Sequence, residues 1–230
     1  LVLVPEFSIL ALEVCLLRAV FRWKFQIISI CDDSMDMIRG NELSRLHALA
    51  RKMAMPMIDD VILPDSEACR WYREHYGKGI FFPIVRDEQA FRMQCREALP
   101  VSLSLQEEYA LRGKKVVLYV GRLAPEKNLE CLVRAAASLP EDTVLVIVGS
   151  GSLKEELQHL AGRMQVSAIF PGWLEGVRLA AWYNLADIFV LPSLVEPFGA
   201  VVNDALAAGC FCLVSGRCGS SCLIRQGWNG

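Results

Sequence analysis

Short apolar segments alternate with helix-forming segments throughout this 230-residue chain, and this alternation restricts the fold more than any other feature. The apolar segments lie at residues 1–4, 26–31, 61–63, 80–82, 115–120, 143–148, 168–170, 187–191 and 210–214. Most of the segments between them have the spacing of amphipathic helices. Alternating strands and helices with short connections favour parallel sheets covered by helices on both faces. The sequence therefore predicts an α/β protein.

One interruption divides this series into two. Residues 86–99 are polar and are followed by Pro100, and a second set of strands and helices starts at Lys115. We therefore expect two domains, residues 1–98 and 99–230. The chain starts directly on an apolar segment and stops without a closing element, so we expect the N-terminal domain to be incomplete and the C-terminal domain to be truncated at its end.

Composition argues against several classes of protein. With 53% hydrophobic and 22% charged residues, the chain is expected to bury a large core. A net charge of −2 gives no reason to expect nucleic acid as a partner. The nine cysteines are odd in number, several lie in apolar segments, and no secretory signal precedes them. We therefore expect reduced, buried thiols in a cytoplasmic protein.

The longest apolar segment, residues 9–20, contains Glu13 and Arg18 and is too short to span a bilayer. Arg18, Arg22 and Lys24, with aromatic residues beside them, could favour peripheral contact with the inner face of a membrane. The preferred alternative is a helix that packs on a sheet and leaves its basic end in water.

The stretch from Glu196 to Asp204 is the most informative for function. It lies between the apolar segment 187–191 and a helix-forming run that ends at Gly209, which places Glu196 in a loop and Asp204 in a helix. Two acids separated by about 12 Å of helix could hold both ends of an extended ligand across a helix N-terminus, where phosphate binds well. Gly199 would let the backbone approach closely. The predicted ligand is a sugar joined to a nucleotide through a diphosphate.

A second loop carries basic residues to the same edge of the sheet. Residues 121–128 follow a predicted strand and precede a predicted helix, and ligands of open α/β sheets bind at that edge. Arg122 and Lys127 could both face a diphosphate and stabilise it as a leaving group. The alternative is that they are ordinary solvated charges. The presence of Glu196 at the same edge favours the functional interpretation.

Two glycine-containing turns are candidates for the nucleotide pocket. Gly149, Ser150 and Gly151 lack the full glycine spacing of a dinucleotide fingerprint, so we expect a tight turn that lines the pocket through its backbone. Gly172 and Trp173 end the next predicted strand, where the indole would either contact the base or pack within the loop.

Two groups of side chains resemble metal sites, but a structural role is the preferred interpretation of each. Cysteines 210, 212, 218 and 222 lack the spacing of a zinc knuckle, and buried thiols are preferred. The acidic group at residues 32, 33 and 36 is interpreted as a turn and cap. We therefore predict no metal site, and we assign none of the three histidines a catalytic role.

Several motifs together carry a family resemblance. They are Val120-Gly121-Arg122-Leu123, Glu126-Lys127-Asn128, Val148-Gly149-Ser150-Gly151, Pro192-Ser193, and Glu196-Pro197-Phe198-Gly199 through Asp204. Their order and spacing resemble the retaining glycosyltransferases of family 4 (glycosyl transferases group 1), which have two Rossmann-like domains in the GT-B architecture. The resemblance is strong over residues 115–230 and extends to 1–100 in layout only. It implies a partial acceptor-side domain at 1–98 and a donor nucleotide-sugar-binding domain at 99–230.

The resemblance also implies a reaction. A hexosyltransferase of polysaccharide biosynthesis would move a sugar from a nucleotide-diphosphate donor to a hydroxyl of a glycan, a lipid-linked sugar or a small molecule. The anomeric configuration would be retained, and no metal or other cofactor would be needed. Arg122 and Lys127 would bind the diphosphate, and Glu196 would hold hydroxyls of the donor sugar.

Further positions follow from the same resemblance. Backbone N–H groups would contact sugar and phosphate at Phe198, Gly199 and Ala200. Asp204 would bind the ribose hydroxyls in place of the usual glutamate. The nucleotide site would be lined by Gly121, Gly149 and Gly172.

Three features depart from the family pattern. Cys31-Asp32-Asp33 stands where the family often has a histidine facing the donor sugar, Cys222 stands in place of a usual glutamate, and the N-terminal glycine-rich loop is missing. Two alternatives stand beside the transferase. One is a sugar-nucleotide epimerase of the same fold, and the other is a catalytically inactive nucleotide-sugar-binding protein.

Overall fold

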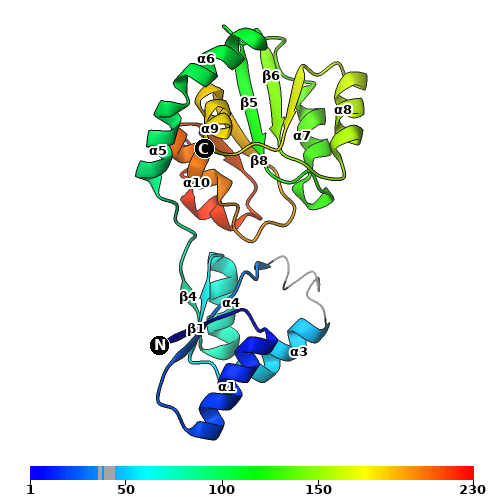
Figure 1. The fold of residues 1–230 in the computed structure, drawn as a ribbon. Helices are drawn as coiled ribbons and strands as arrows, with labels where there is room; N and C mark the ends of the chain where they lie inside the picture. Colours follow the sequence, from blue (N-terminus) through cyan, green and yellow to red (C-terminus); the bar gives the residue numbers. More distant parts are fainter. Residues whose placement is uncertain (36–37, 39–44) are drawn as a thin grey trace. The chain divides into compact units, whose positions relative to one another are not determined.

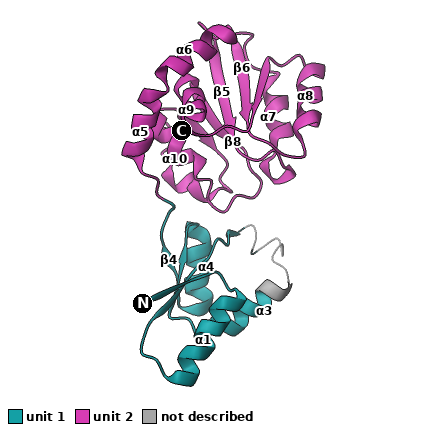
Figure 2. Ribbon diagram, in the orientation of Figure 1, with its two compact units in different colours: residues 1–84 teal, residues 85–230 magenta. Residues whose placement is uncertain are grey.

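The computed structural model describes residues 1–35, 38 and 45–230. The chain forms two compact units, Leu1–Ile84 and Val85–Gly230, drawn in teal and magenta in Figure 2. Each unit has its own hydrophobic core and its own parallel sheet (Figure 1). The α/β architecture predicted from the alternating apolar segments is confirmed.

The boundary between the units lies at Ile84/Val85, upstream of the expected position near residue 98. Helix α5 (Glu88–Glu97) accounts for this difference. Its charged residues are exposed, but Phe91 and Cys95 are buried in the core of the second unit. An amphipathic helix with one buried face is polar on the other, so its composition alone did not show that it belongs to the second unit.

The first unit is a four-stranded parallel sheet in the order β1-β2-β3-β4. Its strands are β1 (Val2–Pro5), β2 (Ile27–Ile30), β3 (Asp60–Leu63) and β4 (Ile80–Phe81). Its helices include α1 (Ile9–Phe21), α3 (Arg45–Ala54) and α4 (Ser66–Tyr76). The strands follow sequence order because each crossover leads to the neighbouring strand. The sequence has helical spacing from Asn41 to Met55, and the start of this predicted helix lies outside the described residues.

The second unit is a five-stranded parallel sheet in the order β7-β6-β5-β8-β9. Its strands are β5 (Lys115–Val120), β6 (Thr143–Val148), β7 (Ala168–Gly172), β8 (Ile188–Leu191) and β9 (Phe211–Val214). Its helices are α5, α6 (Leu99–Glu108), α7 (Leu129–Ala136), α8 (Lys154–Arg163), α9 (Gly176–Leu185) and α10 (Val201–Ala208). Two short 3-10 helices are η1 (Pro125–Lys127) and η2 (Gly219–Leu223).

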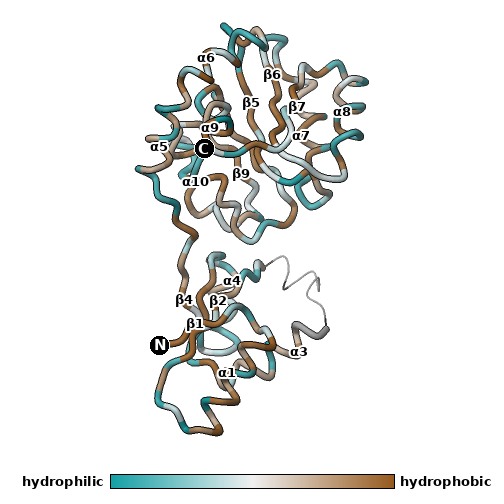
Figure 3. The backbone as a smooth tube through the Cα atoms, in the orientation of Figure 1, coloured by the Kyte–Doolittle hydropathy of each residue, from teal (hydrophilic) through white to brown (hydrophobic). Residues whose placement is uncertain are grey.

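The two central strands of this sheet are covered on both faces. Every residue from Val116 to Val120 in β5 and from Val144 to Val148 in β6 is buried, and both strands are mainly hydrophobic in Figure 3. Helix α7 packs against α8, whereas α9 packs against α5, α6 and α10 (Figure 1). A strand buried on both faces has no polar alternation, which explains the uninterrupted apolar segments in the sequence.

The strand order reverses between β5 and β8. From β5 the chain builds outward through β6 to β7, and it then returns to place β8 on the other side of β5. In open α/β sheets, ligands bind beyond the carboxyl ends of the strands at such a reversal. The loops that follow β5 and β8 therefore lie where a ligand is expected to bind.

Candidate functional site

The loop after β5 and the loop after β8 lie side by side at the carboxyl edge of the sheet. The N–H of Leu194 donates to the carbonyl of Glu126 (2.8 Å). The side-chain amide of Asn128 donates to the carbonyl of Pro192 (3.3 Å). These hydrogen bonds hold the two predicted ligand-binding loops together at the strand-order reversal.

An ion pair joins the same two loops. Lys127 Nζ is 2.5 Å from Glu196 Oε2, and the two side chains are only 9% and 16% exposed. Lys127 ends η1, and Asn128 turns the chain into α7 from the left-handed conformation (φ +55°). Because a buried charge without a partner is very unfavourable, each side chain holds the other in place. The structure thus brings together two of the three predicted catalytic residues.

Arg122, the third of these residues, lies on the surface of the loop after β5. Its Nη2 atom is 3.1 Å from Glu126 Oε1, and its side chain is 75% exposed. Exposed pairs of this kind contribute little to stability. The guanidinium can therefore exchange Glu126 for another anion at small cost.

A buried tyrosine that the sequence did not single out supports this loop. Tyr119 lies on β5, and its hydroxyl donates to the carbonyl of Arg122 (2.8 Å). Burial, followed by the nearby charge of Glu196, raises the pKa of the Tyr119 phenol, so it stays neutral. A Cβ atom on Gly121 would lie 2.6 Å from the Tyr119 hydroxyl oxygen. The phenol therefore leaves no space for a side chain at this position.

The glycine turn after β6 packs against the loop after β5. A Cβ atom on Gly149 would lie 1.8 Å from the carbonyl oxygen of Gly121, and one on Gly151 would lie 2.3 Å from that of Leu123. The N–H of Leu123 donates to the carbonyl of Ser150 (2.9 Å). The tight turn is present, and both glycines are needed for close contact between the two backbones. Whether Gly149 also contacts a nucleotide stays a prediction.

The turn after β7 continues this edge. Gly172 has a positive φ of +86°, and its carbonyl accepts a hydrogen bond from the N–H of Gly149 (2.8 Å). The following Trp173 is 65% exposed. The indole is therefore not packed into the loop, and contact with a base stays a prediction for this position.

The backbone that precedes α10 is tightly held by η2. Phe198 is 2% exposed, and its carbonyl accepts from the N–H of Ser220 (2.8 Å). Gly199 has φ +85°, and a Cβ atom there would lie 2.6 Å from Leu191 Cδ2. Within the described part of the chain, no hydrogen bond is donated by the N–H groups of Phe198, Gly199 and Ala200. These predicted contact points keep their donors available beside the Lys127–Glu196 pair.

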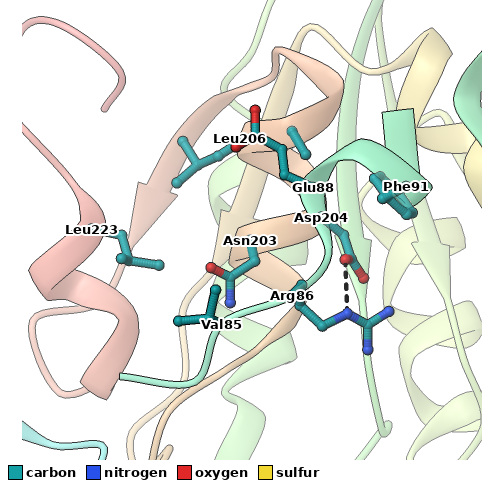
Figure 4. A pocket seen from close by; sticks show the side chains of 9 residues that line it. Val85, Arg86, Glu88, Phe91, Asn203, Asp204, Leu206 and Leu223 are labelled. Atoms are coloured by element: carbon teal, nitrogen blue, oxygen red, sulfur yellow. Dashed lines mark ion pairs between the residues drawn. The ribbon is translucent and has the colours of Figure 1, made fainter. Parts of the chain in front are cut away.

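Asp204 lies in a pocket whose lining includes neither Lys127 nor Glu196. It is the fourth residue of α10, which starts at Val201, so the separation of about 12 Å of helix expected between Glu196 and Asp204 is wrong. Asp204 lines a pocket of about 240 Å³ (Figure 4). The lining residues are Val85, Arg86, Glu88, Phe91, Asn203, Asp204, Leu206, Ala207 and Leu223.

Arg86 is the partner of Asp204 and was missed by the sequence analysis. Its Nε atom is 3.3 Å from Asp204 Oδ1, and the side chains are 52% and 8% exposed (Figure 4). Burial raises the pKa of Asp204, and the charge of Arg86 opposes that rise. No local signal marks Arg86, because its contact is with α10, which lies far along the chain.

The cysteine cluster is a set of thiols rather than a disulfide framework. None of the nine cysteines forms a disulfide, and burial raises the pKa of Cys210, Cys212 and Cys218 to about 12. Cys222 is exposed. Among residues 1–35, 38 and 45–230, no three His, Cys, Asp or Glu side chains are grouped to hold a metal ion.

The acidic turn after β2 contributes to the core of the first unit. Asp33 is 3% exposed, and its Oδ2 atom accepts hydrogen bonds from the Tyr72 hydroxyl (2.5 Å) and from Arg51 Nη1 (3.1 Å). These contacts tie the turn to α3 and α4. Asp36 lies outside the described residues. The structural interpretation of the turn is thus supported for Asp33.

At the basic end of α1, Arg18 makes contacts within the fold, whereas the aromatic residues beside it are exposed. Arg18 pairs with Asp59 at 2.5 Å and donates to the carbonyl of Phe25, so it serves the fold. Phe21 and Trp23 are more than half exposed, and their rings stack at 5.2 Å. No helix in the described residues is long and apolar enough to cross a bilayer.

Comparison with known proteins adds independent information. Residues 104–230, more than half of the chain, match the family model described as glycosyl transferases group 1. The chain is 36% identical over 141 residues to an uncharacterized glycosyltransferase of Methanocaldococcus jannaschii, which covers 56% of this chain and 36% of the relative. It is 34% identical over 169 residues to a GDP-mannose-dependent alpha-mannosyltransferase of Mycolicibacterium smegmatis. This match covers 71% of this chain and 39% of the relative. The chain thus spans little more than a third of the length of these relatives.

Solved structures show the same fold. The crystal structure of Anabaena HepE in complex with UDP matches with a TM-score of 0.81 at 17% identity, over 99% of this chain and 63% of that one. A sucrose-phosphate synthase of Thermosynechococcus elongatus matches with a TM-score of 0.74 at 20% identity. The match covers 97% of this chain and 57% of that one. Similarity at this level of identity supports the fold, and the expected GT-B class is confirmed. The chain belongs to the glycosyl transferases group 1 family.

Proposed function

We propose that this chain is part of a retaining glycosyltransferase of family 4 that transfers a sugar from a nucleotide-diphosphate donor to a hydroxyl acceptor. The observation that carries the proposal is the Lys127–Glu196 pair, 2.5 Å long, at the strand-order reversal of a group 1 family member. One cation and one carboxylate at this position suit a substrate that has both a diphosphate and a sugar.

The roles of the two loops follow from their chemistry. Lys127 and Arg122 bind the donor diphosphate, as a point charge and as a planar fork. Glu196 accepts hydrogen bonds from hydroxyls of the donor sugar. The N–H groups of Phe198, Gly199 and Ala200 contact sugar and phosphate at the start of α10. Asp204 binds the ribose, and Gly121, Gly149 and Gly172 line the nucleotide site.

The reaction proceeds on one face of the donor sugar. The bond between the anomeric carbon and the diphosphate oxygen breaks, and the acceptor oxygen bonds to that carbon from the same side. The leaving diphosphate takes the proton of the acceptor hydroxyl. Lys127 and Arg122 stabilise the negative charge that develops on the diphosphate, so this role needs no divalent metal.

The donor is a hexose nucleotide in this proposal. The Mycolicibacterium relative is named for GDP-mannose and the Anabaena structure contains UDP, so guanosine and uridine diphosphates are the first candidates. The acceptor is a hydroxyl of a glycan, a lipid-linked sugar or a small molecule. The assignments to polysaccharide biosynthesis and to the cytoplasm are part of the same proposal.

The test uses the full-length protein. Thermal unfolding with UDP, GDP, UDP-glucose and GDP-mannose identifies the nucleotide, because a ligand that binds only the native state raises Tm. Transfer is then measured for Lys127→Ala and for a control, Lys115→Ala, which removes an exposed lysine paired with Asp187. Lys127→Ala should abolish transfer in a protein that is less stable but still folded, and Lys115→Ala should not affect transfer. Wild-type turnover by Lys127→Ala would overturn the assignment.

The same assay separates the alternative functions. Conversion of the nucleotide sugar without an acceptor would indicate an epimerase. Binding without any turnover would indicate an inactive nucleotide-sugar-binding protein.

Peripheral membrane contact through Arg22, Lys24 and the exposed Phe21 and Trp23 belongs to the proposal for a lipid-linked acceptor. Flotation with anionic vesicles tests it. Loss of flotation in an Arg22→Glu/Lys24→Glu variant is expected, and absence of wild-type flotation would remove this contact.

A further inference from the structure

The Asp204 carboxylate is buried but incompletely satisfied. The residue is 6% exposed, and within the described residues its Oδ1 atom has no aligned hydrogen-bond donor. Arg86 Nε is 3.3 Å from this oxygen, so the contact is an ion pair without a directed hydrogen bond. Buried polar atoms are nearly always satisfied in native proteins, and an exception calls for an explanation such as a functional role.

The surroundings of the carboxylate fit the nucleoside part of a ligand. The pocket has apolar walls from Val85, Leu206 and Leu223, and Figure 4 shows the Asp204 carboxylate directed toward the Arg86 side chain. A ribose presents hydroxyl donors on one side and carbon atoms on the other. Asp204 can accept from the hydroxyls because an ionised carboxylate has about four lone-pair positions.

We propose that Arg86 is a positioning residue of the donor site, which holds the Asp204 carboxylate in place to accept hydrogen bonds from the ribose of the nucleotide sugar. This inference rests on the proposed function and adds a residue to it. Arg86 acts through Asp204 and does not itself contact the nucleotide. Its half-exposed side chain approaches the buried acid from the segment before α5.

The electrostatics of the site support this role. Burial raises the pKa of Asp204, and Arg86 is the charge that opposes the rise. Glu88, also at the pocket, pairs with Arg92 at 2.6 Å. The remaining titratable groups around Asp204 and its neighbour α9 have pKa values raised by burial, so they stay neutral near pH 7: Cys95, Tyr183 and Cys210. Without Arg86, Asp204 would take up a proton at a higher pH and lose acceptor capacity.

The experiment measures binding to the full-length protein by calorimetry between pH 5.5 and 8. The probes are UDP, GDP and inorganic pyrophosphate, which has the diphosphate but no ribose. The variants are Arg86→Ala, Arg86→Lys, Asp204→Asn and the double variant Arg86→Ala/Asp204→Asn. The matched control is Arg134→Ala, which removes an arginine of similar exposure (56%) that pairs with Glu130 on the surface.

A specific pattern is expected. Arg86→Ala weakens binding of the nucleoside diphosphate by roughly tenfold, the effect of losing one charge-assisted hydrogen bond between Asp204 and the ribose. It leaves pyrophosphate binding unchanged, because pyrophosphate has no ribose. The loss grows as pH falls, and Arg86→Lys recovers part of it. In the Asp204→Asn background the Arg86→Ala change has little further effect, because Arg86 acts through that carboxylate. Arg134→Ala matches the wild type.

Two results would overturn the inference alone. Nucleoside diphosphate binding by Arg86→Ala equal to wild type at every pH would show that Arg86 has no role. An equal loss in the Asp204→Asn background would show direct contact between Arg86 and the ligand. If the wild-type protein binds neither UDP nor GDP, both this inference and the proposed function are wrong. Thermal unfolding of each variant shows that the losses come from a folded protein.

Discussion

The Lys127 ammonium and the Glu196 carboxylate lie 2.5 Å apart although 69 residues separate them in the chain. One ends the 3-10 helix after β5, and the other follows β8. Each neutralises the other in a site that excludes most water. A diphosphate would compete with Glu196 for Lys127, and sugar hydroxyls would compete with Lys127 for Glu196. In the proposed function, the pair would therefore link recognition of both halves of a nucleotide sugar.

Breaking this pair from either side should destabilise the protein. Glu196→Gln or Lys127→Met leaves one buried charge without its partner, at a cost of about 3 kcal/mol in the free energy of unfolding. The double variant should lose less than the sum of the two single losses, because no buried charge remains. Urea denaturation of the full-length protein measures all three. Strictly additive losses would show that the two side chains do not interact.

Gly149 should tolerate no side chain. A Cβ atom there would lie 1.8 Å from the Gly121 carbonyl oxygen, at φ +142°, so Gly149→Ala should lower the free energy of unfolding by about 3 kcal/mol and reduce donor binding. Gly162 in α8 is the matched control, because a Cβ atom added there would have no neighbour within 4 Å. Gly162→Ala should stabilise the protein by about 0.5–1 kcal/mol. Equal effects of the two changes on the denaturation midpoint would contradict the loop contact.

Asp204→Asn should raise stability at neutral pH and weaken nucleotide binding. Burial raises the pKa of Asp204 above its value in the unfolded chain, so the native state binds the proton more tightly. The ionised carboxylate therefore reduces stability above the raised pKa, and protonation removes this cost as pH falls. The Tm difference between variant and wild type should be largest near pH 8 and shrink toward pH 4. A difference that grows as pH falls would contradict this linkage.

Thiol reactivity should separate the cysteines into two classes. Cys131 and Cys222 are exposed, whereas the other seven are buried. The thiolate is the reactive species, and burial both blocks access and raises the pKa, to about 12 for Cys210, Cys212 and Cys218. Brief alkylation of the native protein at pH 8, read by mass spectrometry, should modify Cys131 and Cys222 first. Rapid modification of Cys212 would contradict the buried position of its side chain in β9.

The sequence by itself determined the α/β class, the parallel sheets and the positions of the loops that we propose bind the donor. Strands buried on both faces must be apolar along their length, so segments such as Val116–Val120 and Val144–Val148 are visible without a structure. The carboxyl ends of parallel strands share one edge, so the loops with Lys127 and Glu196 could be placed together. The position of the unit boundary could not be predicted, because α5 is polar on its exposed face. Only the contacts of α5 show which unit it belongs to.

The tertiary structure decided which charges meet. Lys127 pairs with Glu196 while Arg122 pairs with the local Glu126, and Arg86 pairs with Asp204. These choices depend on a few ångströms of loop and helix placement, which residue type and spacing do not encode. Packing of α5 against α10 brings the segment with Arg86 to Asp204, so a residue of the polar segment 86–99 becomes part of the candidate site.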